Sequence, residues 1–370
     1  MNRKPAPLSF KPDLADAARR WDAFYAGEII NRPVICVTAP RPGFTRPPAR
    51  RGYYDKVHAD IDEVITSALA NAEATYWGGE AVPTFSPSFG PDEISVFCGA
   101  ELKWSKDSPD TNWSVPFVED WEKSLPLRIQ EDHPLWQRML ALCRRAGERM
   151  AGKMLVSSLD LHTNMDILAP IRGPQRLCMD LIDQPEMIDR AMASARAIFP
   201  KVWGDIAKAA RMDELGYCHA IYSMEGAAVL QCDFSCMVSP PMFRRWVLPA
   251  LEEEARIVKH AMYHWDGPGA LVHTDDLVRS AGLHSLSYVP GAERGNHIDY
   301  LDLMKKVQAG GKAVQFGGSP DQIKQAHREL RPEKVAYFTA TRTPDEAQQL
   351  LEWFVKNTGC VHANLLSPIA

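Results

Sequence analysis

Apolar positions along the chain recur with two different periods, and from residue 132 onward they predict an alternation of strands and helices. Short apolar runs, rich in β-branched residues, predict strands at residues 154–159, 216–224, 261–265, 286–289, 312–316 and 335–339. Longer segments with apolar residues three and four apart predict helices at residues 133–150, 173–182, 185–212, 240–260, 274–280, 300–309, 320–329 and 344–356. Strands that alternate with helices indicate a parallel sheet that is covered on both faces.

The first 126 residues follow a less regular pattern. Helices are expected at residues 15–25 and 61–74, and a strand is expected at residues 33–38. Residues 1–32 then form a helical extension, and residues 41–51, rich in Pro and Arg, form a loop. Gly, Pro, Ser and Trp dominate residues 76–126, which predicts long loops with short strands that cover an active site.

These elements favour a (β/α)8 TIM barrel as the fold, with residues 1–370 forming one domain. Seven strands can be counted, and an eighth is expected within residues 76–115. Eight parallel strands, each followed by a helix, close into a barrel. The main alternative is an open, doubly wound sheet, but no GxGxxG or Walker loop follows any of the predicted strands.

Composition and charge narrow the class of partner. Hydrophobic residues make up 45% of the chain and charged residues 24%, as in ordinary soluble proteins. The net charge of −5 argues against nucleic acid or an anionic membrane as the main partner, so a small-molecule substrate is expected. The first residues lack an apolar signal core, no apolar run approaches 18 residues, and the eight cysteines form no CxxC pair. We therefore expect a cytoplasmic protein with reduced thiols.

Polar residues are dense just past the predicted strands, where the functional residues of a barrel lie. Asp160, His162 and Asn164 follow the strand at residues 154–159, and Asp233 follows the run at residues 216–224. The candidate catalytic residues are Asp160, His162, Asn164, Asp233 and His273. Each of them, like the neighbouring Asp166, can instead cap a helix or bond to the backbone.

Three further residues form a candidate metal site. His264 and Asp266 are two positions apart on an extended segment, so their side chains point to the same side. Glu225, at the end of the preceding predicted strand, can supply a third ligand. Three protein ligands with an open position are the arrangement of catalytic zinc. The sequence therefore predicts that Glu225, His264 and Asp266 converge with Asp160 at one barrel mouth.

Short motifs follow one another in a characteristic order at residues 90–91, 111–113, 164–169, 172–173, 231–235, 239–240, 243, 248–249, 264–270 and 289–291. In these motifs the chain resembles the uroporphyrinogen decarboxylase-like superfamily of (β/α)8 barrels. The superfamily includes the heme-pathway decarboxylase and the corrinoid-linked methyltransferases. In the methyltransferases, a His-x-Cys pair and a later Cys on the last strand bind zinc; His264 matches the His, whereas Asp266 replaces the first Cys and the last strand has none.

That departure changes the expected chemistry. A metal held by carboxylate oxygens is a stronger Lewis acid than a metal held by two thiolates. Such a metal favours an oxygen substrate over a bound thiol. The Arg-rich substrate motif of the decarboxylases does not follow the first strand, so a porphyrinogen is not expected.

Three hypotheses follow. The resemblance implies a metal-assisted methyltransferase in which a divalent metal, zinc, acts together with a corrinoid on a partner protein. The alternative is a metal-free decarboxylase or lyase, in which Asp160 or Asp233 donates a proton and His264 orients it. The third is a barrel that binds a small molecule without turning it over. Each of the three is compatible with a homodimer.

Overall fold

The computed structural model describes residues 4–44, 50–105 and 111–365, with side chains up to residue 359. The strands are β1 (Val34–Pro40), β2 (Thr75–Gly79), β3 (Thr84–Phe85), β4 (Glu101–Trp104), β5 (Asn112–Val115), β6 (Leu155–Val156), β7 (Tyr217–His219), β8 (Ile221–Ser223), β9 (Ala227–Gln231), β10 (His260–Asp266), β11 (Leu283–Val289), β12 (Ala313–Gly317) and β13 (Val335–Ala340). The α-helices are α1 (Leu14–Ala26), α2 (Tyr53–His58), α3 (Ile61–Glu73), α4 (Glu93–Phe97), α5 (Trp121–Ser124), α6 (Pro134–Met150), α7 (Met165–Arg172), α8 (Pro174–Asp183), α9 (Pro185–Arg196), α10 (Phe199–Ala209), α11 (Met212–Leu215), α12 (Pro240–Met242), α13 (Leu248–Val258), α14 (Thr274–Arg279), α15 (Leu301–Ala309), α16 (Pro320–His327) and α17 (Pro344–Leu365).

A seven-stranded, mostly parallel sheet organises the molecule. Its order is β2-β1-β13-β12-β11-β10-β9, and every neighbouring pair is parallel except β1 with β2. Strands β3 and β6 form a separate parallel pair, and a parallel bridge from Leu161 to Leu230 joins the continuation of β6 to β9. The predicted alternation of strands and helices is confirmed. Within the described residues no ladder pairs β1 with β3, so the hydrogen-bonded ring is not complete.

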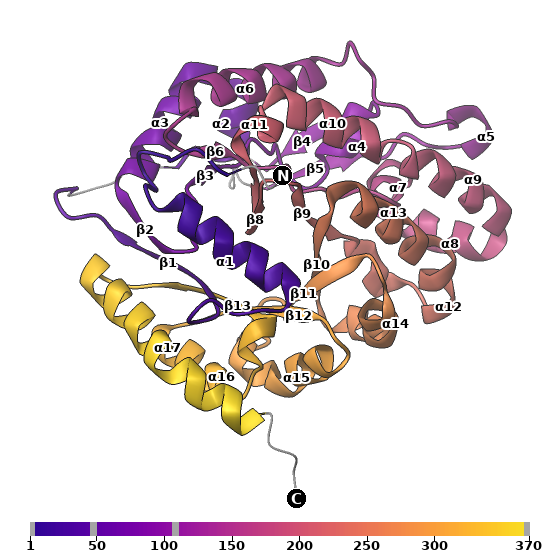
Figure 1. The fold of residues 1–370 in the computed structure, drawn as a ribbon. Helices are drawn as coiled ribbons and strands as arrows, with labels where there is room; N and C mark the ends of the chain where they lie inside the picture. The colour runs from indigo at the N-terminus through magenta and orange to yellow at the C-terminus, as the bar shows by residue number, and fades with distance from the viewer. Residues whose placement is uncertain (1–3, 45–49, 106–110, 366–370) are drawn as a thin grey trace, which may run out of the picture.

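Helices enclose these strands. Helices α3, α6, α10, α13, α15 and α17 lie around the outside of the strands (Figure 1). Apolar strand residues such as Ile35 and Ala228 are fully buried, as the near-continuous apolar runs require. The side chains of Trp21, Trp136 and Trp265 are also completely buried, so the core continues from the strands to the helices that cover them.

The run at residues 216–224, predicted to be one strand of the barrel, is instead an antiparallel hairpin. Strands β7 and β8 pair around Ala220, which adopts a left-handed backbone with φ of 59°. Alanine gives no sequence signal for such a turn, because glycine and asparagine are the usual residues there. The parallel strand is β9, which begins only after Gly226.

Two predicted helices also differ from the structure. The segment at residues 185–212 divides into α9, α10 and α11, and α10 has Pro200 in its first turn, where proline is tolerated. The segment at residues 240–260 is continuous from α12 to α13, but a π-helical turn at Phe243–Val247 lies between them. This wider turn precedes Pro249, which cannot donate a backbone hydrogen bond.

Helix α1 covers the amino ends of strands β10 and β11 (Figure 1). The Tyr25 ring stacks on His260, with 3.8 Å between ring centres, and meets the edge of His284 at 5.1 Å. The Tyr25 hydroxyl donates to the carbonyl of Tyr222 at 2.9 Å. The amino end of the sheet is therefore closed by packed rings.

Residues 76–126 contain short elements, as expected, and they pack against α7. Ser95 on α4 donates to the carbonyl of Ile167, while Arg172 donates to the carbonyls of Val118 and Glu119. This region thus borders the helix that follows β6. Among the helices of the described residues, none has the length and apolar character needed to cross a bilayer.

Candidate functional site

A histidine surrounded by three carboxylates lies just past the carboxyl end of β6. His162 Nδ1 is 3.3 Å from a carboxylate oxygen of Asp166 and 3.8 Å from one of Asp233, and Nε2 is 3.6 Å from one of Asp160. The side chain of His162 is 11% exposed, and that of Asp166 is 5% exposed. Among the described residues, His162, Asp166 and Asp233 form the group whose donor atoms can hold a metal ion, since these atoms lie within 4.8 Å of one another.

The turn from β6 into α7 places these residues together. Asn164, with φ of 51°, caps α7 by accepting the N–H of Met165 at 2.6 Å, so the helix starts immediately. Asp166 then lies in the first helical turn, where its oxygens accept the N–H groups of Asp233 and Phe234 at 2.8 and 2.9 Å. Asp166 therefore fastens the segment after β9 to the start of α7 and fixes the position of Asp233.

On the Nε2 side of His162, a hydrogen bond holds the carboxylate of Asp160 in place. Gln231, the last residue of β9, donates its amide N–H to Asp160 at 2.6 Å. The free oxygen of Asp160 faces His162 Nε2. A carboxylate beside one imidazole nitrogen helps to orient the ring, so that the other nitrogen can face a metal or a proton. Nδ1, which faces Asp166 and Asp233, is that other nitrogen.

The carboxylates control the protonation of this cluster. Burial by itself lowers the pKa of His162, but hydrogen bonds and charges from Asp160 and Asp166 outweigh burial and raise the pKa well above its usual range. Burial raises the pKa of Asp160, but its contact with His162 reverses this effect and lowers the pKa. The carboxylates thus favour the protonated form of His162, and a metal ion at Nδ1 would have to displace that proton.

His264 and Asp266 belong to the same electrostatic neighbourhood. Burial and the charge of Asp166 raise the pKa of Asp233 to about 6, while the charges of His162 and His264 act in the opposite direction and that of Asp266 adds to the rise. His264 lies beside Gln231 in the register of β9 and β10. Asp160 and His264 therefore both lie beside Gln231 at the carboxyl end of β9. The shared site of Asp160, His264 and Asp266 stays a prediction.

Glu225 does not join this group, and its predicted position is wrong. It precedes β9, where Ala227 pairs with His260, whereas His264 lies further along β10. With a rise of about 3.3 Å per residue, six residues separate the two levels by roughly 20 Å. Glu225 forms an ion pair with Lys259 at the amino ends of the strands. The error follows from the hairpin, because the true strand begins after Glu225 and not before it.

Two other candidate residues, Asn164 and His273, make contacts inside the protein. Asn164 is completely buried, and its amide donates to the carbonyl of Gln231 at 3.0 Å. His273 is 1% exposed, contacts the carbonyl of Ser235 at 2.9 Å and stacks on Phe243. The structure thus shows His273 in packing contacts, and its expected catalytic role stays a prediction.

Sequence reasoning missed three residues of the site. Asp166 was open to interpretation as a cap, yet its spacing of four residues from His162 was a signal for a shared face. Gln231 bonds Asp160 and carries no recognisable motif. His219, on the unexpected hairpin, interacts electrostatically with Asp160 and His264, and its Nδ1 has no hydrogen-bond partner among the described residues.

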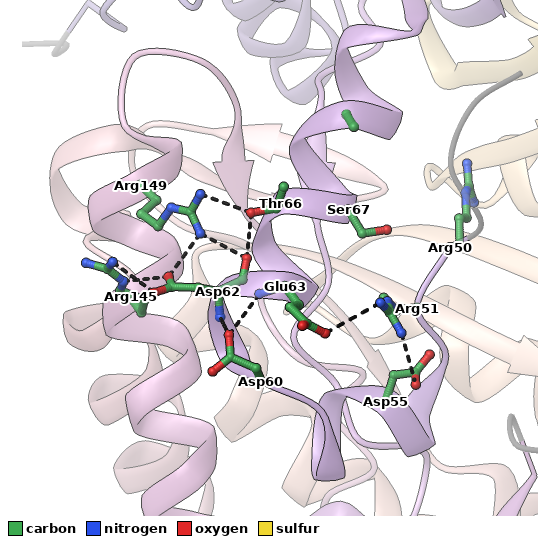
Figure 2. Close-up of a pocket in the computed structure, with 11 residues that line it drawn as sticks. Arg50, Arg51, Asp55, Asp60, Asp62, Glu63, Thr66, Ser67, Arg145 and Arg149 are labelled. Carbon is green, nitrogen blue, oxygen red and sulfur yellow. Dashed lines mark hydrogen bonds and ion pairs between the residues drawn. The ribbon is translucent and has the colours of Figure 1, made fainter. Parts of the chain in front are cut away.

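A hollow of about 930 Å³ lies elsewhere, between α3 and α6 (Figure 2). Its charged side chains are paired: Arg145 and Arg149 on α6 donate to Asp62 on α3 at 2.7 and 2.9 Å. Arg51 lies 3.6 Å from Asp55 on α2. The contacts with Asp62 attach α3 to α6. The hollow therefore has the character of a solvated ion-pair network, and the polar cluster around His162 remains the candidate site.

Comparisons with known proteins bear on the fold. Neither a scan against protein-family models nor a search of curated proteins gave a match. Among solved structures, the chain is similar to a methyltransferase from Methanosarcina mazei, with a TM-score of 0.61 and 12% sequence identity. The match covers 95% of this chain and 99% of that protein. The two proteins thus share a fold along nearly their whole length.

Proposed function

We propose that this chain is a methyltransferase-like enzyme that uses a divalent metal, zinc, together with a corrinoid carried by a partner protein. The observation that carries the proposal is the group formed by His162, Asp166 and Asp233, whose donor atoms lie within 4.8 Å of one another. The group lies past the carboxyl ends of parallel strands, where enzymes of this architecture react. The fold of the chain is similar to that of a methyltransferase, and this similarity supports the choice of methyl transfer as the reaction.

The donor set fits a small divalent ion. Ligands about 2.1 Å from a tetrahedral zinc ion stand about 3.4 Å apart. The distances from His162 Nδ1 to the oxygens of Asp166 and Asp233 are 3.3 and 3.8 Å, close to that edge. One nitrogen and two oxygens leave a fourth position open to an oxygen of the substrate. These three ligands replace the predicted set of Glu225, His264 and Asp266, because Glu225 lies at the amino ends of the strands and cannot reach His264.

When bound, the metal would supply Lewis acidity toward the substrate oxygen. The protein residues orient the ligand ring and supply a proton. Asp160, held by Gln231, fixes the orientation of the His162 ring. When a methyl group leaves an oxygen atom, that oxygen keeps the electron pair of the broken bond and needs a proton. His264 is half-buried at this end of the strands, and in the proposal it donates that proton.

The proposal includes a complete (β/α)8 barrel as the frame of the site. Strands β3, β6 and β9 to β13 together with β1 give eight parallel strands, since the Leu161–Leu230 bridge joins β6 to β9. The seam between β1 and β3 is where the barrel would close. This frame and the resemblance of the His264 segment support membership of the uroporphyrinogen decarboxylase-like superfamily.

One observation favours a second candidate function, a metal-free lyase acting on a small carboxylated molecule. The same contacts that can orient a metal ligand also form an acid–base group, because His162 lies between Asp160 and Asp166. In this alternative His162 donates the proton that replaces the lost carboxylate.

Metal analysis separates the two functions. The purified chain is incubated with zinc or cobalt, desalted and analysed for metal, and cobalt is also followed by its visible absorption. The methyltransferase proposal expects one ion per chain and methyl transfer between methylcobalamin and a small oxygen nucleophile. A chain that takes up no divalent metal, yet releases carbon dioxide from small carboxylic acids, would refute the proposal in favour of the lyase.

A further inference from the structure

A chamber of about 310 Å³ lies at the seam between β1 and β3, beside the hairpin of β7 and β8. Strand β1 contributes Cys36 and Thr38, β3 contributes Thr84, and the hairpin contributes Ala220 at its tip. No ladder crosses this seam in the described part of the chain, which leaves room between the strands. The chamber therefore occupies the position where the barrel interior would otherwise be filled by strand side chains.

Solvent reaches part of the chamber wall, whereas other wall residues such as Trp21 and Tyr222 are buried. Thr38 and Phe338 are half-buried near the carboxyl ends of β1 and β13, and Ala220 is exposed at the tip of the hairpin. Side chains in a packed core would be closed to water, as Ile35 on the neighbouring position of β1 is. The chamber is thus open to a small molecule rather than filled by the protein.

The lining is apolar and aromatic, and it offers no free charge. Trp77, Tyr222 and Phe338 contribute rings. The charged side chain that lines the chamber is Glu80, which is completely buried and already accepts from Arg32 at 3.0 Å and from the N–H of Ile35 at 2.8 Å. An ion brought into such a chamber would lose its hydration without gaining a partner. The chamber therefore selects uncharged molecules.

The lining also holds a polar group that the protein leaves unused. The hydroxyl of Thr339 has no hydrogen-bond partner among the described residues. At the hairpin tip, Ala220 is next to His219 of β7, and β7 packs against β6 and β9, the strands that lead to Asp160 and Gln231. The hairpin thus connects the chamber to the polar cluster, and Thr339 can fix one oxygen or amide of a bound molecule.

The volume limits the size of that molecule. A dry cavity of about 150 Å³ holds one benzene molecule. At about 310 Å³, the chamber has room for one substituted ring and little more. Flat rings also pack well against the faces of indole and phenyl side chains.

We propose that this chamber binds the body of the reacting molecule, and that this body is an uncharged, single-ring aromatic compound with one polar substituent. The inference rests on the proposed function only in treating the bound compound as the reactant. Binding to the chamber itself requires neither metal nor turnover. Its success or failure can therefore be measured separately from that of the metal site.

The experiment compares ligands of one shape and different charge by calorimetric titration of the metal-free chain. Benzamide and benzoate have the same outline, as do benzyl alcohol and benzylammonium. The neutral member of each pair should bind at least about tenfold more tightly, because the chamber cannot pair a charge. Ala220→Leu, which adds bulk to the chamber, should weaken benzamide binding at least tenfold, with circular dichroism as the folding control.

A second variant keeps the test valid if Ala220→Leu disturbs the hairpin. Thr339→Val preserves shape and removes one hydrogen bond, which should weaken benzamide binding about 3- to 10-fold. Thr66→Val, on the distant surface drawn in Figure 2, should leave binding unchanged. Equal or tighter binding of benzoate, or benzamide binding that neither chamber variant alters, would overturn the proposal.

Discussion

The histidines at the two ends of the parallel strands have opposite environments. At the amino ends, burial lowers the pKa of His260 and of His284 to about 4, and both rings pack against Tyr25. At the carboxyl end, His162 is just as enclosed, but Asp160 and Asp166 raise its pKa. One end holds neutral rings in packing contacts, and the other holds a charge among carboxylates.

This difference separates stability from chemistry. Neutral stacked rings keep no unsatisfied charge and add buried area, which favours folding. A buried histidine among three carboxylates gives the native state little stability, since desolvation offsets much of the attraction. Such a cluster retains a proton or binds a metal, which is what a reaction site requires. Changes at the two ends should therefore have separable effects, the largest of them at the carboxyl end.

The largest effect is expected from removal of His162. His162→Ala deletes one of three proposed ligands, so metal affinity should fall by more than the roughly 10- to 100-fold loss that is usual for a supporting residue. Metal content per chain measures this loss, and thermal unfolding should remain close to that of the wild type. His58→Ala, on the exposed surface of α2, is the matched control and should retain the metal. Full metal content in His162→Ala would remove this residue from the site.

The amino end should respond in the opposite way. Tyr25→Ala removes the ring that stacks on His260 and the hydrogen bond to Tyr222. Because the ring is only half-buried, the free energy of unfolding should fall by about 2–3 kcal/mol, somewhat less than for a fully buried aromatic side chain. Urea unfolding measures the change, while zinc content should stay constant. A Tyr25→Ala chain of normal stability without metal would contradict the division between the two ends.

Acid should destabilise the amino end through its histidines. His284 has a pKa of about 4 in the folded chain and about 6.5 when unfolded, so the unfolded state binds more protons between these values. Its contribution to stability is therefore complete above pH 6.5 and declines as the pH falls toward 4, by at most about 1.4 kcal/mol per pH unit. His284→Gln, which cannot titrate, should reduce this slope in urea unfolding between pH 7 and pH 4.5. An unchanged slope would show that other groups dominate.

The sequence predicted the regular part of the molecule more accurately than its site. Strands β10 to β13 are largely buried and are separated by helices, and burial of this kind produces the pattern from which they were predicted. The hairpin of β7 and β8 looked like a single strand, because its turn is made by Ala220, and tertiary contacts rather than local preference hold that residue left-handed. This single misreading placed Glu225 at the wrong end of the strands.

The residues of the site could be predicted only in part, for a similar reason. Asp160, His162 and Asp233 were identifiable because each follows an apolar run. The role of Asp166 depends on its hydrogen bonds to Asp233 and Phe234, which are far from it in sequence. No local pattern encodes such contacts. Residues that act through the backbone of another segment are therefore the ones that sequence reasoning overlooks.

A smaller effect is expected from Asp160→Asn. The amide keeps the shape and still accepts a hydrogen bond, but it loses the charge that orients His162. Metal affinity should fall about 10- to 100-fold, the usual loss for a partner of a ligating histidine. Competition with a chelator of known affinity measures the change, and Asp213→Asn, on the surface of α11, serves as the control. A loss equal to that of His162→Ala would make Asp160 a ligand itself.

The smallest effect is expected from Glu225→Gln, although the sequence pattern made Glu225 a metal ligand. Its carboxylate pairs with Lys259 and is 43% exposed, and exposed ion pairs contribute at most about 1 kcal/mol. Lys259 gives the main reason for the lowered pKa of Glu225, so the pair is local. Unfolding should therefore change only slightly, and metal content and chelator competition should equal those of the wild type. A chain that loses its metal through this substitution would bring Glu225 to the carboxyl ends of the strands, which the parallel register of β9 and β10 forbids.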